Sequence, residues 1–240
     1  MNEVNAKNRH LSFLEHLEEL RSRIIKSLWV VVVCAFVAYG FSSEVLKFLI
    51  KPIGHLVFTS PAEAFLATIN VTFFLGVLLA FPFVGYEIWA FAAGALTKSE
   101  RRYVFIFAPV SLILFLAGTI FGYVVIVPIS LKFLLSFSSP SLIPLISVSQ
   151  YISFVGSFVL SFGIVFELPL VVVFLTKIGI ASPEFLRQKR KYAIVFIFII
   201  SAILTPPDCM SQLLMAIPLV VLYEAGILLC TFVYREKLNR

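Results

Sequence analysis

Long stretches without a charged residue most limit how this chain can fold. Uncharged runs of 17, 23 and 29 residues lie between Lys26 and Glu44, between Glu63 and Glu87, and between Arg102 and Lys132. A helix that crosses the hydrocarbon core of a bilayer needs about 20 apolar residues. The 240 residues are 60% hydrophobic and 13% charged, with mean hydropathy +1.03, whereas a soluble domain is roughly a quarter charged. The composition argues against a soluble enzyme, a disordered chain or a nucleic-acid-binding domain, and indicates an integral membrane protein.

Charged residues and a loop rich in Ser and Pro at 136–150 divide the chain into six predicted transmembrane helices of an all-α fold. We place these spans at about 22–46, 65–92, 103–128, 150–177, 192–205 and 210–234, after an N-terminal amphipathic helix at about 12–21. Capping patterns precede several apolar runs, as at Ser60 to Glu63, Thr205 to Asp208 and Ser182 to Glu184. The fifth span is short for a core about 30 Å thick, which predicts local thinning or cover by a partner helix.

Basic residues predict the orientation of these spans. With six spans, 16 of the 19 Lys and Arg residues fall on the face that carries both termini, and only Lys47, Lys51 and Lys132 fall on the other. Cytoplasmic loops carry the excess of Lys and Arg. We therefore predict a multi-pass protein of the cytoplasmic (inner) membrane with both termini in the cytoplasm, and the net charge of +6 needs no nucleic acid to explain it.

The sequence offers no pattern of a known catalytic site. Its three histidines, His10, His16 and His55, lie outside the predicted spans, and no nucleophile elbow, HExxH motif or phosphate-binding loop occurs. The three cysteines lie apart in apolar sequence without metal-ligand spacing. We expect no enzyme, no metal and no cofactor.

Glu167 is a candidate functional residue because it lies deep in the fourth predicted span. A carboxylate there costs a few kcal/mol on insertion scales and commonly lines a pathway or a site. Pro169 follows it and should kink the helix. The alternative is that Glu167 is protonated and hydrogen-bonds a neighbouring helix. A proton relay through Glu167, Glu224 and Asp208 would instead suggest a small proton-coupled transporter, although the two halves of the chain show no inverted repeat.

Other polar residues carry two interpretations each. Asp208 fits a helix cap as well as a functional role. Thr205 and Gln212 fit either a polar patch for a partner helix or ordinary hydrogen bonds between helices. Glu19 and Arg23 are spaced to form a simple salt bridge, which from the residues alone is the preferred interpretation. Carboxylates on a basic face, such as Glu100, are alternatively suited to bind an incoming guanidinium.

Several segments resemble one family in order and spacing over nearly the whole chain. The run from His16 to Arg23 resembles the HLxELRxR signature of TatC, the polytopic subunit of the twin-arginine (Sec-independent) protein translocase. The segments that resemble its other motifs are Tyr86 to Phe91 with Leu96 to Arg102, Phe162 to Pro169, Ser182 to Tyr192, and Leu204 to Glu224. Gly94 departs from the family, which often has Pro there.

The resemblance implies a single TatC-like membrane domain over 1–240, a curved, glove-like bundle that binds signal peptides. By position, Glu19, Arg21, Phe91 and Glu100 would bind the twin-arginine pair, and Glu167 would face the concave groove. Thr205 and Gln212 would dock partner helices. The cap on the outer, periplasmic side would contain Pro52, Glu63, Phe65 and Asp208.

The resemblance also implies the function and the partners. The chain would be the signal-peptide receptor and core subunit of a translocase that exports folded proteins using the proton-motive force. Its partners would be the single-span subunits TatA and TatB, the twin-arginine signal peptides of folded cargo, membrane lipid, and further copies of itself in a receptor complex. The proton-coupled transporter remains the alternative from another class.

Overall fold

The computed structural model describes residues 2–51, 53, 56–57, 60–94, 104–139, 144–205 and 208–238, with side chains between Glu15 and Tyr234 inside these ranges. The described chain is helical, and an isolated β-bridge joins Val57 to Ser147. The prediction of an all-α fold is confirmed.

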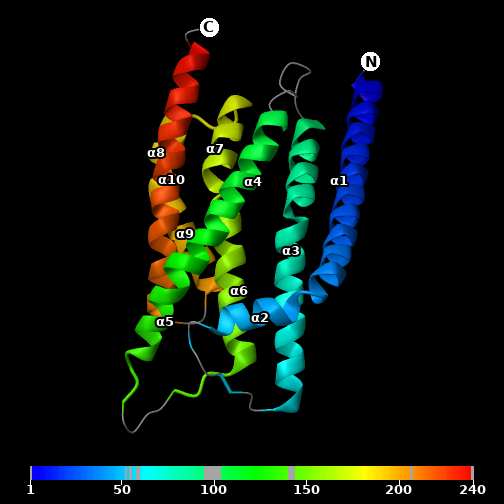
Figure 1. Ribbon diagram of the computed structural model, residues 1–240. Helices are drawn as coiled ribbons and strands as arrows, with labels where there is room; N and C mark the ends of the chain where they lie inside the picture. Colours follow the sequence, from blue (N-terminus) through cyan, green and yellow to red (C-terminus); the bar gives the residue numbers. More distant parts are fainter. Residues whose placement is uncertain are drawn as a thin grey trace. The chain divides into compact units, whose positions relative to one another are not determined.

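Ten α-helices and one π-helical turn make up the described chain (Figure 1). Their bounds are α1 Asn2–Tyr39, α2 Ser42–Ile50, α3 Pro61–Gly94, α4 Val104–Phe121, η2 Gly122–Ile126, α5 Val127–Leu135, α6 Val148–Val165, α7 Leu168–Lys177, α8 Pro183–Gln188, α9 Arg190–Leu204 and α10 Cys209–Leu238.

Five described segments are long and apolar enough to cross a membrane: Glu15–Tyr39, Pro61–Gly94, Phe105–Leu135, Val148–Lys177 and Cys209–Tyr234. They match five of the six predicted spans. The remaining prediction, 192–205, corresponds to α9, a helix of only 15 residues. At 1.5 Å per residue, α9 is shorter than a hydrocarbon core of about 30 Å. Its predicted shortness is therefore confirmed.

The first two predicted segments are one continuous helix. The amphipathic helix expected at 12–21 and the span expected at 22–46 merge into α1, which ends at Tyr39. The prediction that the span reaches residue 46 is wrong, because the chain turns after Tyr39. There, Phe41 N donates to Ala38 O, and the Ser42 hydroxyl donates to Tyr39 O at 2.7 Å as α2 begins.

The third and fourth predicted spans also differ from straight helices. The third extends beyond the predicted residue 128, through the π-helical turn η2, to Leu135. The fourth is broken at Phe166 and Glu167, between α6 and α7. Pro169 has no backbone N–H for the i→i−4 ladder, which accounts for a break one turn earlier. The expected kink is therefore confirmed.

The chain forms two compact units, which are described separately. The N-terminal unit comprises residues 1–42 and 72–112, and the C-terminal unit comprises residues 43–71 and 113–240. In the N-terminal unit, α1 packs closely on α3: a Cβ on Gly76 would lie 2.7 Å from the Ala35 Cβ. Trp89 and Phe107 hold α3 against α4, with ring centroids 5.1 Å apart. The single domain implied by the resemblance stays a prediction.

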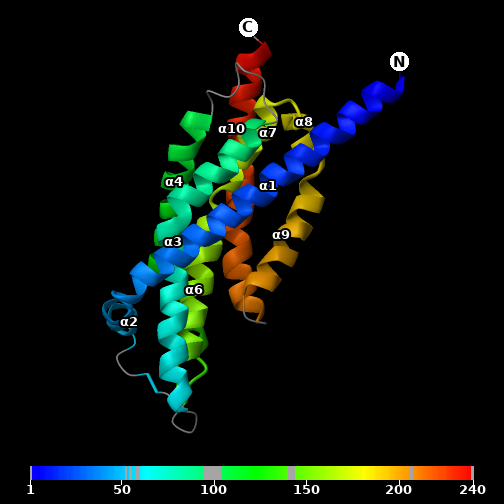
Figure 2. The same ribbon diagram turned by 90° about the vertical axis from the view of Figure 1, so that its right-hand side faces the viewer.

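Aromatic side chains and glycines build the core of the C-terminal unit. Phe115, Phe158 and Phe162 are fully buried. A Cβ on Gly118 would lie 2.3 Å from the Phe162 carbonyl oxygen, and one on Gly163 would lie 2.6 Å from the Phe115 ring. Glycine at these positions therefore allows α4 and α6 to approach closely. On the other side of this unit, α10 packs against α7 and α9, and Figure 2 shows α9 and α10 as neighbouring helices.

Candidate functional site

Arg23 joins two carboxylates in the N-terminal unit. Its Nη1 donates to Glu87 Oε2 at 2.6 Å, while Nη2 and Nε donate to Glu19 Oε1 at 2.7 and 3.1 Å. Glu19 and Arg23 lie one turn apart on α1, and Glu87 lies on α3. We call these three residues the Arg23 cluster. Its distances are those of charge-assisted hydrogen bonds, the stronger class in proteins.

The three members of the Arg23 cluster differ in their access to the surface. The side chain of Glu87 is only 9% exposed, that of Arg23 23%, and that of Glu19 38%. A peptide that approached α1 would therefore reach Glu19 before Glu87. Two carboxylates against one guanidinium give the cluster a formal charge of −1, which suits it to a further cation.

His16 connects Phe91 to the Arg23 cluster, because its ring contacts both Phe91 and Glu19. The two rings stack with centroids 4.3 Å apart and planes 12° from parallel. His16 Nδ1 is also 3.6 Å from Glu19 Oε2. Two predicted site residues, Glu19 and Phe91, are thus brought together, with His16 between them.

Gly94 ends α3 next to the same carboxylate. A Cβ at this position would lie 3.4 Å from Glu19 Oε2 and 3.7 Å from His16 Cε1. A larger residue would pack against the oxygen that Arg23 leaves unused. A side chain at residue 94 would therefore contact both Glu19 and His16.

Arg21 lies on another part of α1. It is exposed and lines a shallow hollow of 350 Å³ with Glu18, Ser22, Ile25 and Lys26. The hollow is lined by neither Glu19 nor Phe91. A role for Arg21 in peptide binding stays a prediction. Two other predicted site residues, Glu100 and Pro52, lie outside the described residues.

Glu167 occupies the break between α6 and α7 in the C-terminal unit. Its backbone N–H donates to Ile164 O at 3.1 Å, and its carbonyl accepts from Val171 N at 2.9 Å. One carboxylate oxygen, Oε1, is shielded from solvent. The break therefore holds a carboxylate among apolar helices, as the sequence predicted. Its role in a groove stays a prediction.

The residues predicted to form an outer cap have different environments. Glu63, in the first turn of α3, is buried and accepts a hydrogen bond from the Ser147 hydroxyl. Nearby, Val57 pairs with the same segment: Val57 N donates to Ile146 O at 3.1 Å, and Val148 N donates to Val57 O at 3.0 Å. Phe65 is instead 65% exposed. Glu63 thus ties the start of α3 to the start of α6.

The capping pattern from Thr205 to Asp208 is arranged differently from the prediction. Thr205 ends α9 and donates its hydroxyl to Ser201 O at 2.8 Å, whereas Asp208 caps α10 by accepting from Ser211 N at 2.7 Å. The predicted N-cap at Thr205 is wrong, because α10 begins three residues later. For Asp208, the capping interpretation is confirmed.

Gln212 links α10 to α9, since its Nε2 donates to Phe198 O at 3.1 Å. The Gln212 bond joins two helices, as the simpler interpretation expected, whereas the Thr205 hydroxyl bonds within the last turn of α9. Partner docking at these residues stays a prediction.

Glu224, the third acid of the alternative proton relay, is in a salt bridge. Arg190 Nη2 donates to Glu224 Oε2 at 2.6 Å, and the two side chains are 47% and 41% exposed. Next to it, the Tyr223 hydroxyl donates to Leu186 O at 2.9 Å. Glu224 thus ties α10 to the start of α9.

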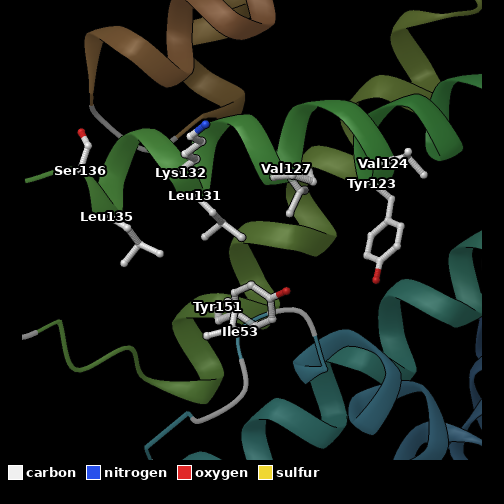
Figure 3. A pocket seen from close by; sticks show the side chains of 10 residues that line it. Ile53, Tyr123, Val124, Val127, Leu131, Lys132, Leu135, Ser136 and Tyr151 are labelled. Carbon is white, nitrogen blue, oxygen red and sulfur yellow. The ribbon is translucent and has the colours of Figure 1, made fainter. Parts of the chain in front are cut away.

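A cavity of 780 Å³ in the C-terminal unit lies beneath α5 (Figure 3). Leu131, Leu135 and Val127 point into it from α5, facing Ile53 and Tyr151. The ammonium group of Lys132 points away from these leucines. The lining of this cavity contains no carboxylate. It therefore does not resemble the Arg23 cluster and has no feature that would select a cation.

Glu87 is a site residue that the sequence patterns do not single out. In the sequence it marks the end of an uncharged run and lies within the segment Tyr86 to Phe91. A usable signal was present, because a carboxylate near the end of a long apolar helix requires a cationic or hydrogen-bonding partner. Arg23 supplies that partner from α1, 64 positions away in the sequence.

Comparisons with known proteins identify the family. A model described as "Sec-independent protein translocase protein (TatC)" matches residues 15–218. TatC of Carboxydothermus hydrogenoformans is 40% identical over 238 residues, which cover 97% of this chain and 98% of that protein. TatC of Aquifex aeolicus is 39% identical over 231 residues, with coverages of 93% and 96%.

A solved structure agrees with this assignment. The crystal structure of a twin-arginine translocase receptor TatC superposes with a TM-score of 0.84 and 38% sequence identity, and covers 91% of this chain and 99% of that one. The fold and the sequence thus point to the same relatives. The chain belongs to the TatC family of Sec-independent protein translocase proteins.

Proposed function

We propose that this chain is the signal-peptide receptor and core subunit of a twin-arginine translocase, which exports folded proteins using the proton-motive force. The proposal is supported by family membership and by the described part of the chain having five membrane-length helices. In this role the chain binds and positions a peptide and catalyses no covalent chemistry.

The observation that carries the proposal is the Arg23 cluster with its adjoining ring pair. A twin-arginine peptide brings two guanidiniums, which bind carboxylates through paired N–H donors in a fixed geometry. Glu19 offers an accessible carboxylate, and the stacked His16 and Phe91 lie beside it. Glu100 would supply the second carboxylate for the peptide. A Lys side chain has no such planar fork, so this chemistry favours Arg over Lys.

The distribution of basic residues supports a particular orientation of the chain in the membrane. Sixteen of 19 basic residues fall on one face of the proposed six-span arrangement, which supports an orientation with both termini in the cytoplasm and a location in the cytoplasmic membrane. A negatively charged peptide site on this basic face would be accessible from the cytoplasm, where the cargo proteins are made.

The same family assignment supports a proposal for the partners. TatA and TatB would dock as single helices near α9 and α10, where α9 is short for a hydrocarbon core and a partner helix could cover it. Further copies of this chain would join the receptor complex. The alternative of a proton-coupled transporter has no support in the comparisons, and Glu224 of its relay is paired with Arg190.

Site-specific photo-crosslinking tests the proposal. A photoreactive residue at Ser99, next to Glu100, should crosslink to a signal peptide containing Arg-Arg and not to its Lys-Lys form. The same residue at Ser136, on the opposite predicted face, is the control and should crosslink to neither. Glu100→Gln should abolish the Ser99 crosslink while the protein still inserts. Equal crosslinking of both peptides would reject the receptor role, and unchanged crosslinking in Glu100→Gln would reject the role of Glu100.

A further inference from the structure

We infer that Glu87 is a positioning residue of the peptide site: it holds Arg23 so that Glu19 remains able to accept a guanidinium from the peptide. The inference rests on the proposed function and separates the role of Glu87 from that of Glu19, which would contact the peptide. Glu87 itself is too buried to touch a peptide, with a side chain 9% exposed. Its effect has to pass through Arg23.

The two carboxylate oxygen atoms of Glu19 have different neighbours. Both Arg23 donors, Nη2 and Nε, use the same oxygen, Oε1. The other oxygen, Oε2, faces His16 Nδ1 at 3.6 Å, longer than a normal hydrogen bond, and lies beside Gly94. A carboxylate has about four acceptor positions. Oε2 is thus the position at which a second guanidinium can bind.

Glu87 determines how much of the Arg23 charge falls on Glu19. Nη1 is directed at Glu87 Oε2 across 2.6 Å, so that one guanidinium is divided between two carboxylates. Without the charge of Glu87, Arg23 would neutralise Glu19 alone, and its two terminal nitrogens could both turn onto that carboxylate. An incoming guanidinium would then meet a neutral pair with a cation at its surface. The like-charge repulsion would weaken binding.

The shielding of Glu87 explains why the arrangement should persist. Removing the partner of a shielded charge leaves that charge uncompensated, which is unfavourable. If Arg23 moved into solvent, the 9% exposed carboxylate of Glu87 would lose its ion-pair partner. A peptide guanidinium thus adds to the Arg23 cluster rather than replacing Arg23.

A charge-rescue experiment tests the inference on the full-length protein in nanodiscs. Affinity is measured by fluorescence anisotropy for a signal peptide with Arg-Arg and for its Lys-Lys form. Glu87→Gln should lower the affinity for Arg-Arg about tenfold, the change expected for roughly 1.4 kcal/mol. The double variant Glu87→Gln with Arg23→Gln removes one negative and one positive charge and leaves Glu19 ionised. It should bind within about twofold of the wild type, since one charge-neutral pair has been removed.

A structural role for Glu87 makes the opposite prediction, because removing both partners would then add further damage. An affinity of the double variant as low as that of Glu87→Gln, or lower, would overturn the inference, and so would unchanged binding by Glu87→Gln. If Glu87→Gln is not recovered from membranes, the double variant decides the outcome alone: near-wild-type binding supports the inference and lost binding overturns it. Glu18→Gln, an exposed change of the same charge on α1, is the matched control and should bind as the wild type does.

Failure of the proposed function would look different. In that case the wild type itself would bind the Arg-Arg and Lys-Lys peptides equally. A wild type that prefers Arg-Arg, together with a Glu87→Gln variant that binds normally, would reject only the positioning role.

Discussion

Arg23 Nη1 lies 2.6 Å from Glu87 Oε2, so that α1 and α3 of the N-terminal unit are joined by an ion pair between residues 64 positions apart. The same guanidinium holds Glu19, one helical turn before it. A local salt bridge that the sequence suggested is therefore one half of a larger cluster. The tertiary partner is the member most shielded from solvent.

Glu19→Gln should weaken binding of a twin-arginine peptide by about ten- to a hundredfold, since a hydrogen bond to a charged group contributes about 1.5–3 kcal/mol. The amide retains the shape of the side chain but not the charge that a guanidinium recognises. Titration of labelled peptide into the protein in nanodiscs measures the change. Glu15→Gln removes a charge on the same helix outside the Arg23 cluster and should bind normally. Equal affinities for Glu19→Gln and the wild type would rule out Glu19 as a contact.

Glu167→Gln should preserve folding and reduce export. Gln has nearly the same shape as Glu, so the break between α6 and α7 can keep its hydrogen bonds at Ile164 and Val171. If the carboxylate acts through its charge or proton, the amide cannot replace it. Export of a folded reporter and thermal unfolding of the purified protein measure the two effects. Normal export with unchanged unfolding would favour packing as the role of Glu167.

Gly118→Ala should destabilise the C-terminal unit by about 1–3 kcal/mol, the range for overpacking a core. The new Cβ would lie 2.3 Å from the Phe162 carbonyl oxygen, so the backbones of α4 and α6 would have to separate. Gly85→Ala is the matched control, because its Cβ would meet no atom closer than 3.5 Å. Thermal unfolding should show a lower midpoint for Gly118→Ala alone. Equal midpoints would mean that α4 and α6 can accommodate the added methyl group without loss of stability.

Asp208→Ala should destabilise the start of α10 by about 1 kcal/mol through loss of its cap. Asp208 Oδ1 accepts from Ser211 N at 2.7 Å, a bond that Asn can replace and Ala cannot. Thermal unfolding and export are measured for both variants. If capping is the whole role of Asp208, Asp208→Asn should behave as the wild type in both. Loss of export in the Asn variant with normal unfolding would show that the charge itself is required.

The helix positions were largely predictable because they depend on local properties. Uncharged runs require burial in lipid, and the basic residues between them mark the ends. Pro169 predicted the break between α6 and α7 because it lacks an N–H. The predicted boundary between residues 21 and 22 is not a helix end, because no helix-breaking residue occurs there and α1 continues through it.

The candidate site was only partly predictable for a related reason. Glu19 and Arg23 are neighbours on one helix, so their spacing alone suggested a contact. Stacking of His16 on Phe91 and the approach of Glu87 to Arg23 join different helices. No local pattern encodes such contacts, since they depend on how α3 is rotated and placed along α1.

By itself, the sequence determined that this chain is an all-helical membrane protein, where its helices lie, and which family it resembles. Those properties follow from hydrophobic length, charge placement and ordered motifs, all of which are local in the chain. Only the tertiary structure decided that Glu87 shares Arg23 with Glu19, that Asp208 and not Thr205 caps α10, and that Glu224 pairs with Arg190. The two ion pairs depend on the distance between atoms on separate helices, which packing sets, whereas the cap depends on the residue at which α10 begins.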